Sequence, residues 1–331
     1  MRDDPSLRGR PLAIGGASSR RGVVATCNYE ARAYGVHSAL PTAIAMQRCP
    51  QLIVMPPNMS KYKAVALQIR EIFARYSDCI EPLSLDEAYL DVSQSPHFHG
   101  SASLIAEAIR REVKAELGIS ISAGVAPNKF LAKIASDWQK PDGLTVIRPD
   151  QVGAFVGDLP VSKIHGVGKV MAAKMSALGI DTCGQLQDWS ELALVERFGR
   201  FGRQLYGYAR GEDHRPVKPE RRRKSLSVER TFARDVVPGD EADAALQALI
   251  DELLTRLQSL PELKIAGAFV KMKSQSFRIT TVEQRLPRGL DVACYPTLMN
   301  EAWARLESPV RLMGVGVRFA DTDFAGQLSL F

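Results

Sequence analysis

A basic, proline-containing segment near residue 220 constrains the fold of this chain more than any other feature, because it divides two well-patterned regions. The whole chain of 331 residues has 43 Lys+Arg against 37 Asp+Glu, a net charge of +6. Seven basic and two acidic residues of this one segment account for five of those charges: Arg215, Lys218, Arg221, Arg222, Arg223, Lys224 and Arg230, with Glu220 and Glu229. Since the segment also lacks a helical apolar period, we predict an exposed linker at a domain boundary.

Strand-like and helix-like stretches alternate before the linker, which predicts a mixed α/β region. Apolar spacing predicts strands over Leu52–Met55 and Ile119–Val125 and helices over Ala64–Phe73, Leu104–Val113 and Phe130–Trp138. From about residue 150 to residue 211 the pattern becomes wholly helical. That part is predicted to be a small all-helical domain.

The region after the linker is predicted to be a compact α+β domain. A helix face rich in leucine can cover one side of a sheet there. The expected order is a strand over Leu226–Phe232, a helix over Glu241–Leu257, strands over Ile265–Met272 and Phe277–Glu283, a helix over Tyr295–Leu306 and a strand over Val310–Phe319.

Cysteine spacing and hydropathy exclude several classes of protein. The five cysteines are scattered and form no CxxC or Cys/His cluster, which disfavours a disulfide framework or a structural zinc site. No apolar run approaches the roughly 18 residues of a membrane span, and the first residues lack the apolar core of a signal peptide. We therefore expect a cytoplasmic protein without a membrane partner.

Two adjacent carboxylates, Asp86 and Glu87, interrupt the strand-like sequence PLSLDEAYLD. Neighbouring residues of an extended chain point to opposite faces, so both can reach one ion only at a bend or a strand end. Carboxylate oxygens suit Mg²⁺, which commonly takes one or two of them together with substrate phosphates. The alternative is a solvated turn, in which such acidic pairs are common.

A second polar cluster follows an apolar stretch at residues 23–25. If a helix begins near Asn28, Tyr29 and Arg32 share a face, and Thr26 can join them. A guanidinium beside two hydroxyls suits phosphate oxygens. The alternative is an arginine that pairs with Glu30 on the surface.

Two further patterns are consistent with binding of a polyanion such as DNA. The sequence Gly166-Val167-Gly168-Lys169 before the predicted helix Val170–Leu178 has the form of a helix-hairpin-helix, whose amides can approach a phosphate. Lys271, Lys273 and Arg278 alternate with apolar residues and are predicted to share one sheet face. An ordinary helical turn and a merely solvated face are the alternatives.

The chain ends in three large apolar side chains within the sequence QLSLF. Apolar groups at a free terminus enter their own core poorly, so a groove of a partner protein is the expected destination. The alternative is a tail that packs on its own domain. The residues concerned are Gln327, Leu328, Leu330 and Phe331.

Four sequence signatures in the expected order, CNYEARAYGV, PLSLDEAYLD, SDWQKPDG and QLSLF, resemble those of the Y family of translesion DNA polymerases, specifically its bacterial DNA polymerase IV type. The resemblance covers residues 3–331. It implies an α+β multidomain protein, a right hand with an added little finger. The implied parts are fingers at 1–60, palm at 61–148, helix-hairpin-helix thumb at 149–213, basic linker at 214–225, little finger at 226–321 and tail at 322–331.

The resemblance also implies a role for each cluster in template-directed addition of deoxynucleotides to a primer. Asp86 and Glu87 would bind two Mg²⁺ ions, and Thr26, Tyr29, Arg32 and Lys140 would hold the incoming triphosphate. DNA would be contacted by Gly166, Gly168, Lys169, Arg221, Arg222, Arg223, Lys224, Lys271, Lys273 and Arg278. The terminal peptide would dock on the sliding clamp, the β subunit of the replicase, and the chain itself would be a monomer.

The sequence departs from the family at its beginning. Family members open with an apolar strand that carries another metal-binding Asp, followed by an aromatic residue that rejects ribonucleotides, and this sequence starts after both. The expectation is that the chain as written binds DNA and the clamp but adds nucleotides poorly. Two other hypotheses are a catalytically defective DNA-binding and clamp-docking protein, and a helix-hairpin-helix repair factor whose acidic pair cuts DNA.

Overall fold

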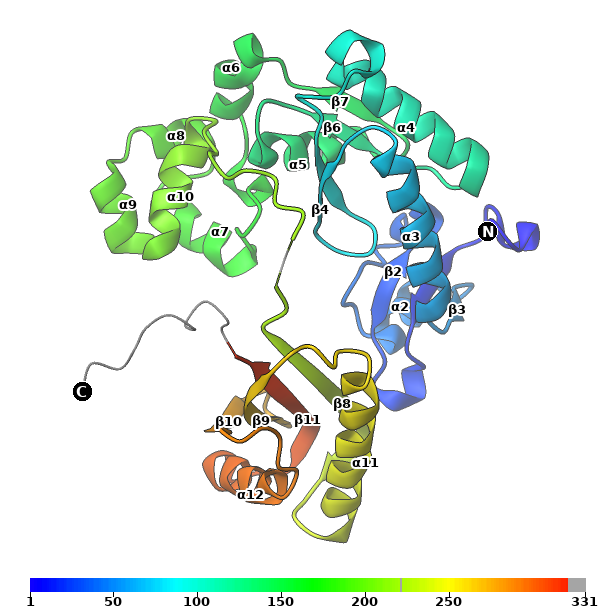
Figure 1. Ribbon diagram of the computed structural model, residues 1–331, viewed down its shortest axis with the longest axis vertical. Helices are drawn as coiled ribbons and strands as arrows, with labels where there is room; N and C mark the ends of the chain where they lie inside the picture. The colour runs from blue at the N-terminus through cyan, green and yellow to red at the C-terminus, as the bar shows by residue number, and fades with distance from the viewer. Residues whose placement is uncertain (221, 321–331) are drawn as a thin grey trace. The chain divides into compact units, whose positions relative to one another are not determined.

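The computed structural model describes residues 1–220 and 222–320, which form two compact units (Figure 1). One unit consists of residues 58–220. The other joins residues 3–57 to residues 222–320. Each unit combines helices with small sheets, as expected for an α+β multidomain chain.

A three-stranded sheet organises residues 3–57. Its central strand β1 (Leu12–Gly15) pairs antiparallel with β2 (Val24–Cys27) and parallel with β3 (Ile53–Met55). The short helices α1 (Tyr29–Arg32) and α2 (Thr42–Arg48) lie between β2 and β3 in the chain. Their core is built from Ala13, Val24, Ala31, Val36, Leu40, Ala45, Cys49 and Leu52.

Two two-stranded sheets and three helices form the first part of the other unit. They are the antiparallel pair β4 (Cys79–Pro82) and β5 (Ala88–Asp91), the parallel pair β6 (Ala123–Val125) and β7 (Leu144–Val146), and the helices α3 (Met59–Ala74), α4 (Ala102–Leu117) and α5 (Lys129–Trp138). The strand predicted over residues 119–125 is shorter than expected. Its partner β7 has only three residues, so Ile119 and Ile121 pack against the core between α3 and α4 instead of pairing.

The region after residue 150 is helical, as predicted. Its helices are α6 (Val152–Gly157), α7 (Lys169–Ser176), α8 (Cys183–Gln187), α9 (Glu191–Phe198) and α10 (Arg200–Ala209). The apolar face of α5 joins their core through Phe130, Leu131 and Ile134, and the Phe130 ring stacks on Tyr208 with centroids 4.2 Å apart. Helix α5 therefore belongs to both parts of this unit.

The four-stranded sheet of residues 222–320 is antiparallel throughout and has two helices on one face (Figure 1). Its strand order is β10 (Ile279–Arg285), β9 (Ile265–Ser274), β11 (Val310–Phe319) and β8 (Ser225–Val236), and its helices are α11 (Asp240–Leu257) and α12 (Cys294–Leu306). The predicted order of strands and helices is confirmed. Buried leucines of α11, including Leu246 and Leu249, pack against Val270 and Val315 of the sheet.

The start of the predicted linker is largely exposed, as expected, and it is hydrogen-bonded to the unit that precedes it. Lys129 on α5 donates to the Pro216 carbonyl at 3.1 Å, and the Lys218 amide donates to a Glu81 carboxylate oxygen at 2.7 Å. Asp213 accepts the Phe130 amide at 3.0 Å. The exposed chain thus runs along β4 and the first turn of α5 because buried polar groups there need these partners.

Candidate active site

The acidic pair lies where the sequence predicts a bend. Strands β4 and β5 pair from Cys79–Asp91 to Pro82–Ala88, and the Leu83 amide closes the turn by donating to the Glu87 carbonyl at 2.9 Å. Asp86 is exposed in this turn, and one of its carboxylate oxygens accepts the Ser84 hydroxyl at 2.5 Å. Both carboxylates therefore leave the chain at the end of one hairpin.

Helix α5 presents two lysines to this hairpin. Lys133 forms an ion pair with Glu87 at the turn, and Lys129, one helical turn earlier, pairs with Glu81 on β4 at 2.5 Å. The side chains of Lys129 and Lys133 are 10% and 16% exposed. Sequence reasoning missed both contacts. The available signal was the position of these lysines among buried apolar residues of an amphipathic helix.

Hydrogen bonding sets the charge state of Glu81. Burial opposes ionisation, but hydrogen bonds from Lys129 and the Lys218 amide outweigh it and hold the pKa of Glu81 below its usual range. Asp213 behaves in the same way: burial would raise its pKa, whereas hydrogen bonds from Arg215 lower it. The carboxylates that join α5 to the linker are thus ionised and paired.

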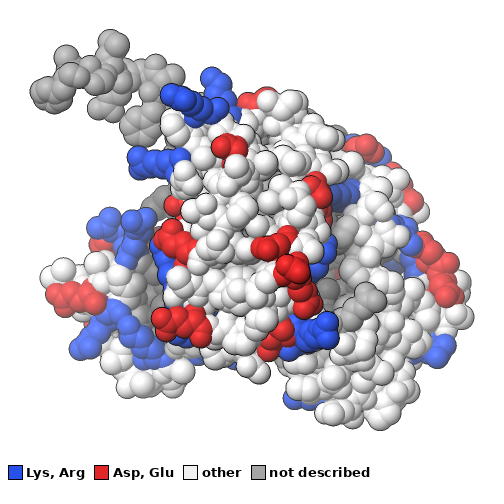
Figure 2. Space-filling model, turned by 90° about the horizontal axis from the view of Figure 1, so that it is seen from below, with Lys and Arg blue, Asp and Glu red and all other residues white. Residues whose placement is uncertain are grey.

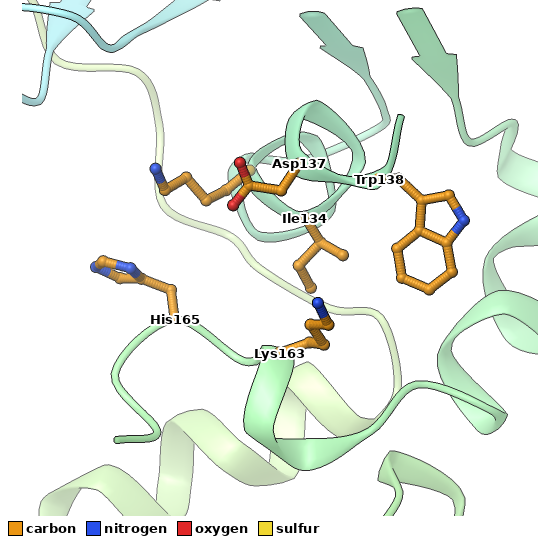
Figure 3. Close-up of a pocket in the computed structure, with 6 residues that line it drawn as sticks. Ile134, Asp137, Trp138, Lys163 and His165 are labelled. Carbon is orange, nitrogen blue, oxygen red and sulfur yellow. The ribbon is translucent and has the colours of Figure 1, made fainter. Parts of the chain in front are cut away.

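Lys140 follows α5 and forms an ion pair with Asp137, three residues earlier. Asp137, Trp138, Lys163 and His165 line a cavity of about 300 Å³ together with Lys133 and Ile134 (Figure 3). The close-up shows Lys163 and His165 on the chain that approaches α5 from the helical part. Positive side chains from two parts of the unit therefore share one cavity with a single carboxylate, Asp137.

The second polar cluster has the predicted local geometry. Asn28 caps α1 by accepting the Ala31 amide at 3.1 Å, and its amide group donates to the Arg10 carbonyl at 2.7 Å. Tyr29 is exposed, and the Arg32 guanidinium carbon lies 5.9 Å from its ring centroid.

Thr26 is exposed on β2, directly before this cap. Among the described side chains no ion pair joins Arg32 to Glu30, so the surface-pair alternative is not what the structure shows. Thr26, Tyr29 and Arg32 belong to one unit, whereas Asp86, Glu87 and Lys140 belong to the other.

A glycine-containing turn lies directly before α7. Gly166 has a φ of +98°, which disfavours any side chain, and an added Cβ would lie 3.1 Å from the Phe201 ring. Gly168 occupies the N-cap of α7, and Lys169, its first residue, is exposed. Val167 is buried between the glycines and anchors the turn.

The prediction of one basic sheet face is wrong for Arg278. Ile279 pairs with Lys273, so Arg278 precedes β10 on the opposite side, where its guanidinium donates to the Arg305 carbonyl of α12 at 3.2 Å. Lys271 does lie on the open face, but it pairs with Glu229 at 2.7 Å. Figure 2 likewise shows acidic and basic side chains interspersed on the face it presents.

The remaining predicted site residues include several that the structure does not describe. Arg222, Arg223 and Lys224 precede β8, and the Lys224 carbonyl accepts the Phe319 amide at 3.0 Å. Arg221 lies outside the described residues. So do the clamp-peptide residues, namely Gln327, Leu328, Leu330 and Phe331.

The described residues contain neither a membrane-spanning helix nor a cluster of three metal-ligating side chains. Across residues 1–220 and 222–320, no helix is both long and apolar enough to cross a membrane. In the same part of the chain, no three His, Cys, Asp or Glu side chains form a group that could hold a metal ion.

Comparison with protein families defines the class. Residues 1–137 match the model described as impB/mucB/samB family, residues 158–213 match DNA polymerase-iota, thumb domain, and residues 223–330 match impB/mucB/samB family C-terminal domain. A solved chimera of the Y-family polymerases Dbh and Dpo4 aligns with 95% of this chain and 93% of its own, at 29% identity and a TM-score of 0.86. The chain belongs to the Y family of DNA polymerases.

Two relatives within that family carry the name DNA polymerase IV. The protein named DNA polymerase IV of Ralstonia nicotianae is 53% identical over 100% of this chain and 93% of its own length. The protein of the same name from Pseudomonas aeruginosa strain UCBPP-PA14 is 56% identical over 100% of this chain and 95% of its own length.

Proposed function

We propose that this chain is a translesion DNA polymerase of the DNA polymerase IV type, which extends a primer on a template with deoxynucleoside triphosphates in the bacterial cytoplasm. The observation that carries the proposal is identity of 53% and 56% to two such enzymes along the whole chain. The adjacent carboxylates at the β4–β5 turn supply the matching chemistry. We assign residues 1–60 to the fingers, 61–148 to the palm, 149–213 to the thumb, 214–225 to the linker and 226–321 to the little finger.

The donor set at the hairpin fits Mg²⁺. Asp86 and Glu87 offer hard oxygen ligands at a turn, and Mg²⁺ commonly binds one or two carboxylates with substrate phosphates and water completing its shell. When bound, Mg²⁺ would stabilise negative charge on the reacting phosphate and activate the primer hydroxyl. The protein's own task is to hold these carboxylates at the turn, which the hydrogen bond from Ser84 to Asp86 and the ion pair from Lys133 to Glu87 accomplish.

The triphosphate is assigned to two groups of residues. Thr26 and Tyr29 provide hydroxyls beside the Arg32 guanidinium, and the Asn28 cap fixes the start of α1 beneath them. Lys140 supplies a further positive charge when its ion pair with Asp137 is broken. Positioning and electrostatics dominate phosphoryl-type transfer, so such contacts account for most of what the protein contributes.

DNA and the clamp complete the proposed partners. The glycine turn at Gly166 and Gly168 offers exposed amides to a phosphate, with Lys169 beside them. The run from Arg221 to Lys224 and the lysines of β9 add positive charge. Gln327, Leu328, Leu330 and Phe331 are proposed to dock on the sliding clamp.

The proposed function is tested by template-directed primer extension. The purified chain is given a primer-template, one deoxynucleotide at a time and Mg²⁺, first on undamaged DNA and then opposite an abasic site. We expect slow addition directed by the template base, in line with the expectation from the sequence, and extension past the lesion. DNA binding without any addition would support the catalytically defective alternative. Cleavage of either strand without extension would instead support the repair-nuclease hypothesis.

Arg32→Ala is expected to raise the apparent KM for the deoxynucleotide about tenfold and to lower kcat, because a guanidinium–phosphate contact serves both the ground state and the transition state. Single-turnover kinetics across a range of nucleotide concentrations measure both values. Primer-template affinity should not change, and Arg8→Ala, another exposed arginine of the same unit, serves as the control. A loss of DNA affinity with normal nucleotide kinetics would place Arg32 against the duplex.

Replacing Arg221, Arg222, Arg223 and Lys224 by alanine is expected to weaken DNA binding and flatten its salt dependence. Each lost phosphate contact removes about 0.9 from the slope of log affinity against log salt, so four contacts remove about 3.6. Fluorescence anisotropy between low and moderate salt measures the slope. Arg256→Ala, which removes one arginine paired with Glu252 on α11, controls for the loss of a single positive charge outside the run. An unchanged slope would indicate that these four residues form a solvated linker that does not contact DNA phosphates.

A further inference from the structure

Lys133 occupies an unusual position for a lysine. It lies on α5 between buried Leu131 and buried Ile134, and its side chain is only 16% exposed. Most exposed ion pairs contribute little because both side chains move freely in water. Packing along the helix restricts the stem of Lys133, and although this side chain also lines the cavity that contains Asp137, its ammonium group pairs with the Glu87 carboxylate.

The pairing partner is the carboxylate assigned to the metal. Glu87 directs one of its two oxygens to Lys133, while its side chain remains 39% exposed at the turn. The neighbouring lysine of α5, Lys129, makes the equivalent contact with Glu81 on β4. Helix α5 therefore neutralises one carboxylate on the strand and one at the turn.

We propose that Lys133 neutralises the Glu87 carboxylate in the metal-free protein. A divalent cation must then compete with Lys133 for that carboxylate. The inference rests on the proposed function, in which Glu87 is a metal ligand. A cation at Glu87 would lie close to the ammonium group, and two positive charges in a partly buried site repel each other strongly. The pair holds Glu87 in place beside Asp86 before metal arrives and weakens metal binding in the absence of nucleotide. Lys133 is a positioning residue in this proposal.

The test is a titration of the full chain with Mn²⁺, without DNA or nucleotide, in which free Mn²⁺ is followed by its electron paramagnetic resonance signal. Wild type is expected to show a weak site that Glu87→Gln abolishes. Lys133→Met removes the charge and keeps an unbranched stem, and should tighten that site about tenfold. Lys133→Arg keeps the charge and should bind Mn²⁺ like wild type.

Lys163→Met is the matched control. Lys163 lines the same cavity as Lys133 but contributes from the helical part of the unit (Figure 3). Its loss should change Mn²⁺ affinity by less than about twofold, because Lys163 is exposed and the charge of a hydrated side chain is screened. Thermal unfolding checks that each variant is folded, and Lys133→Gln replaces Lys133→Met if the latter is not.

The outcomes separate this inference from the proposed function. Unchanged or weaker Mn²⁺ binding by the neutral Lys133 variant, at a site that Glu87→Gln still abolishes, overturns the counter-charge role and leaves the metal site intact. An equal effect of Lys163→Met also overturns it, because general charge then explains the result. If Glu87→Gln does not affect Mn²⁺ binding, the metal assignment itself is wrong and the inference fails with it.

Discussion

Asp86→Ala is expected to lower the rate of nucleotide addition about a thousandfold or more while the chain still binds primer-template DNA. Asp86 is exposed at the β4–β5 turn and supports no core residue, so its removal should leave the fold unchanged. Loss of one group that stabilises charge in a transition state commonly costs a factor of 10² to 10³. A metal ligand shared with the reacting phosphate should lie at or beyond the upper end.

Single-turnover primer extension measures the effect, and Asp78→Asn provides the control. Asp78 is another exposed carboxylate, located just before β4 at the far end of the same hairpin. The Asp78→Asn variant should extend primers at the wild-type rate. Near-normal extension by Asp86→Ala would remove the acidic pair from catalysis, whereas equal loss in both variants would indicate a general electrostatic effect.

The local features of the site could be predicted from sequence because they depend on neighbours in the chain. Adjacent carboxylates can converge only at a bend, and Asp86 and Glu87 are indeed in the hairpin turn. Asn28 is a strong N-cap residue, and α1 begins directly after it. In both cases a short-range rule fixes the geometry.

The prediction that failed and the contacts that were not predicted depend on strand register and on residues far apart in the sequence. Whether Arg278 shares a face with Lys273 is decided by the turn between β9 and β10, in which Phe277 has a φ of +65°. Strand alternation alone cannot set that register. The pairs Lys129–Glu81 and Lys133–Glu87 join residues 48 and 46 positions apart, and no local period specifies them.

Lys129→Met is expected to destabilise the unit of residues 58–220 by about 3 kcal/mol, because it leaves the largely buried Glu81 carboxylate without its ion-pair partner. The same change removes the hydrogen bond to the Pro216 carbonyl, so the linker loses one attachment. Denaturant unfolding measures the free energy. Amide hydrogen exchange at residues 217–219 should speed up in the variant.

The double variant Lys129→Met with Glu81→Gln separates pairing from packing. If the cost comes from an unpaired charge, neutralising Glu81 should recover more than half of the lost stability. If it comes from a poorly packed stem, the second change should add its own cost instead. The choice of glutamine keeps an acceptor for the Lys218 amide.

Acid provides an independent check on the same pair. The folded-state pKa of Glu81 is lowered, so its contribution is complete above the unfolded value of about 4.3 and is lost as the pH falls through the folded value. The stability difference between wild type and Lys129→Met should therefore be constant near pH 7 and shrink below about pH 4. A difference that persists unchanged in acid would show that Lys129 stabilises the fold through contacts that do not depend on the Glu81 charge, such as its hydrogen bond to the Pro216 carbonyl, and the pairing of α5 with β4 would then have no electrostatic role.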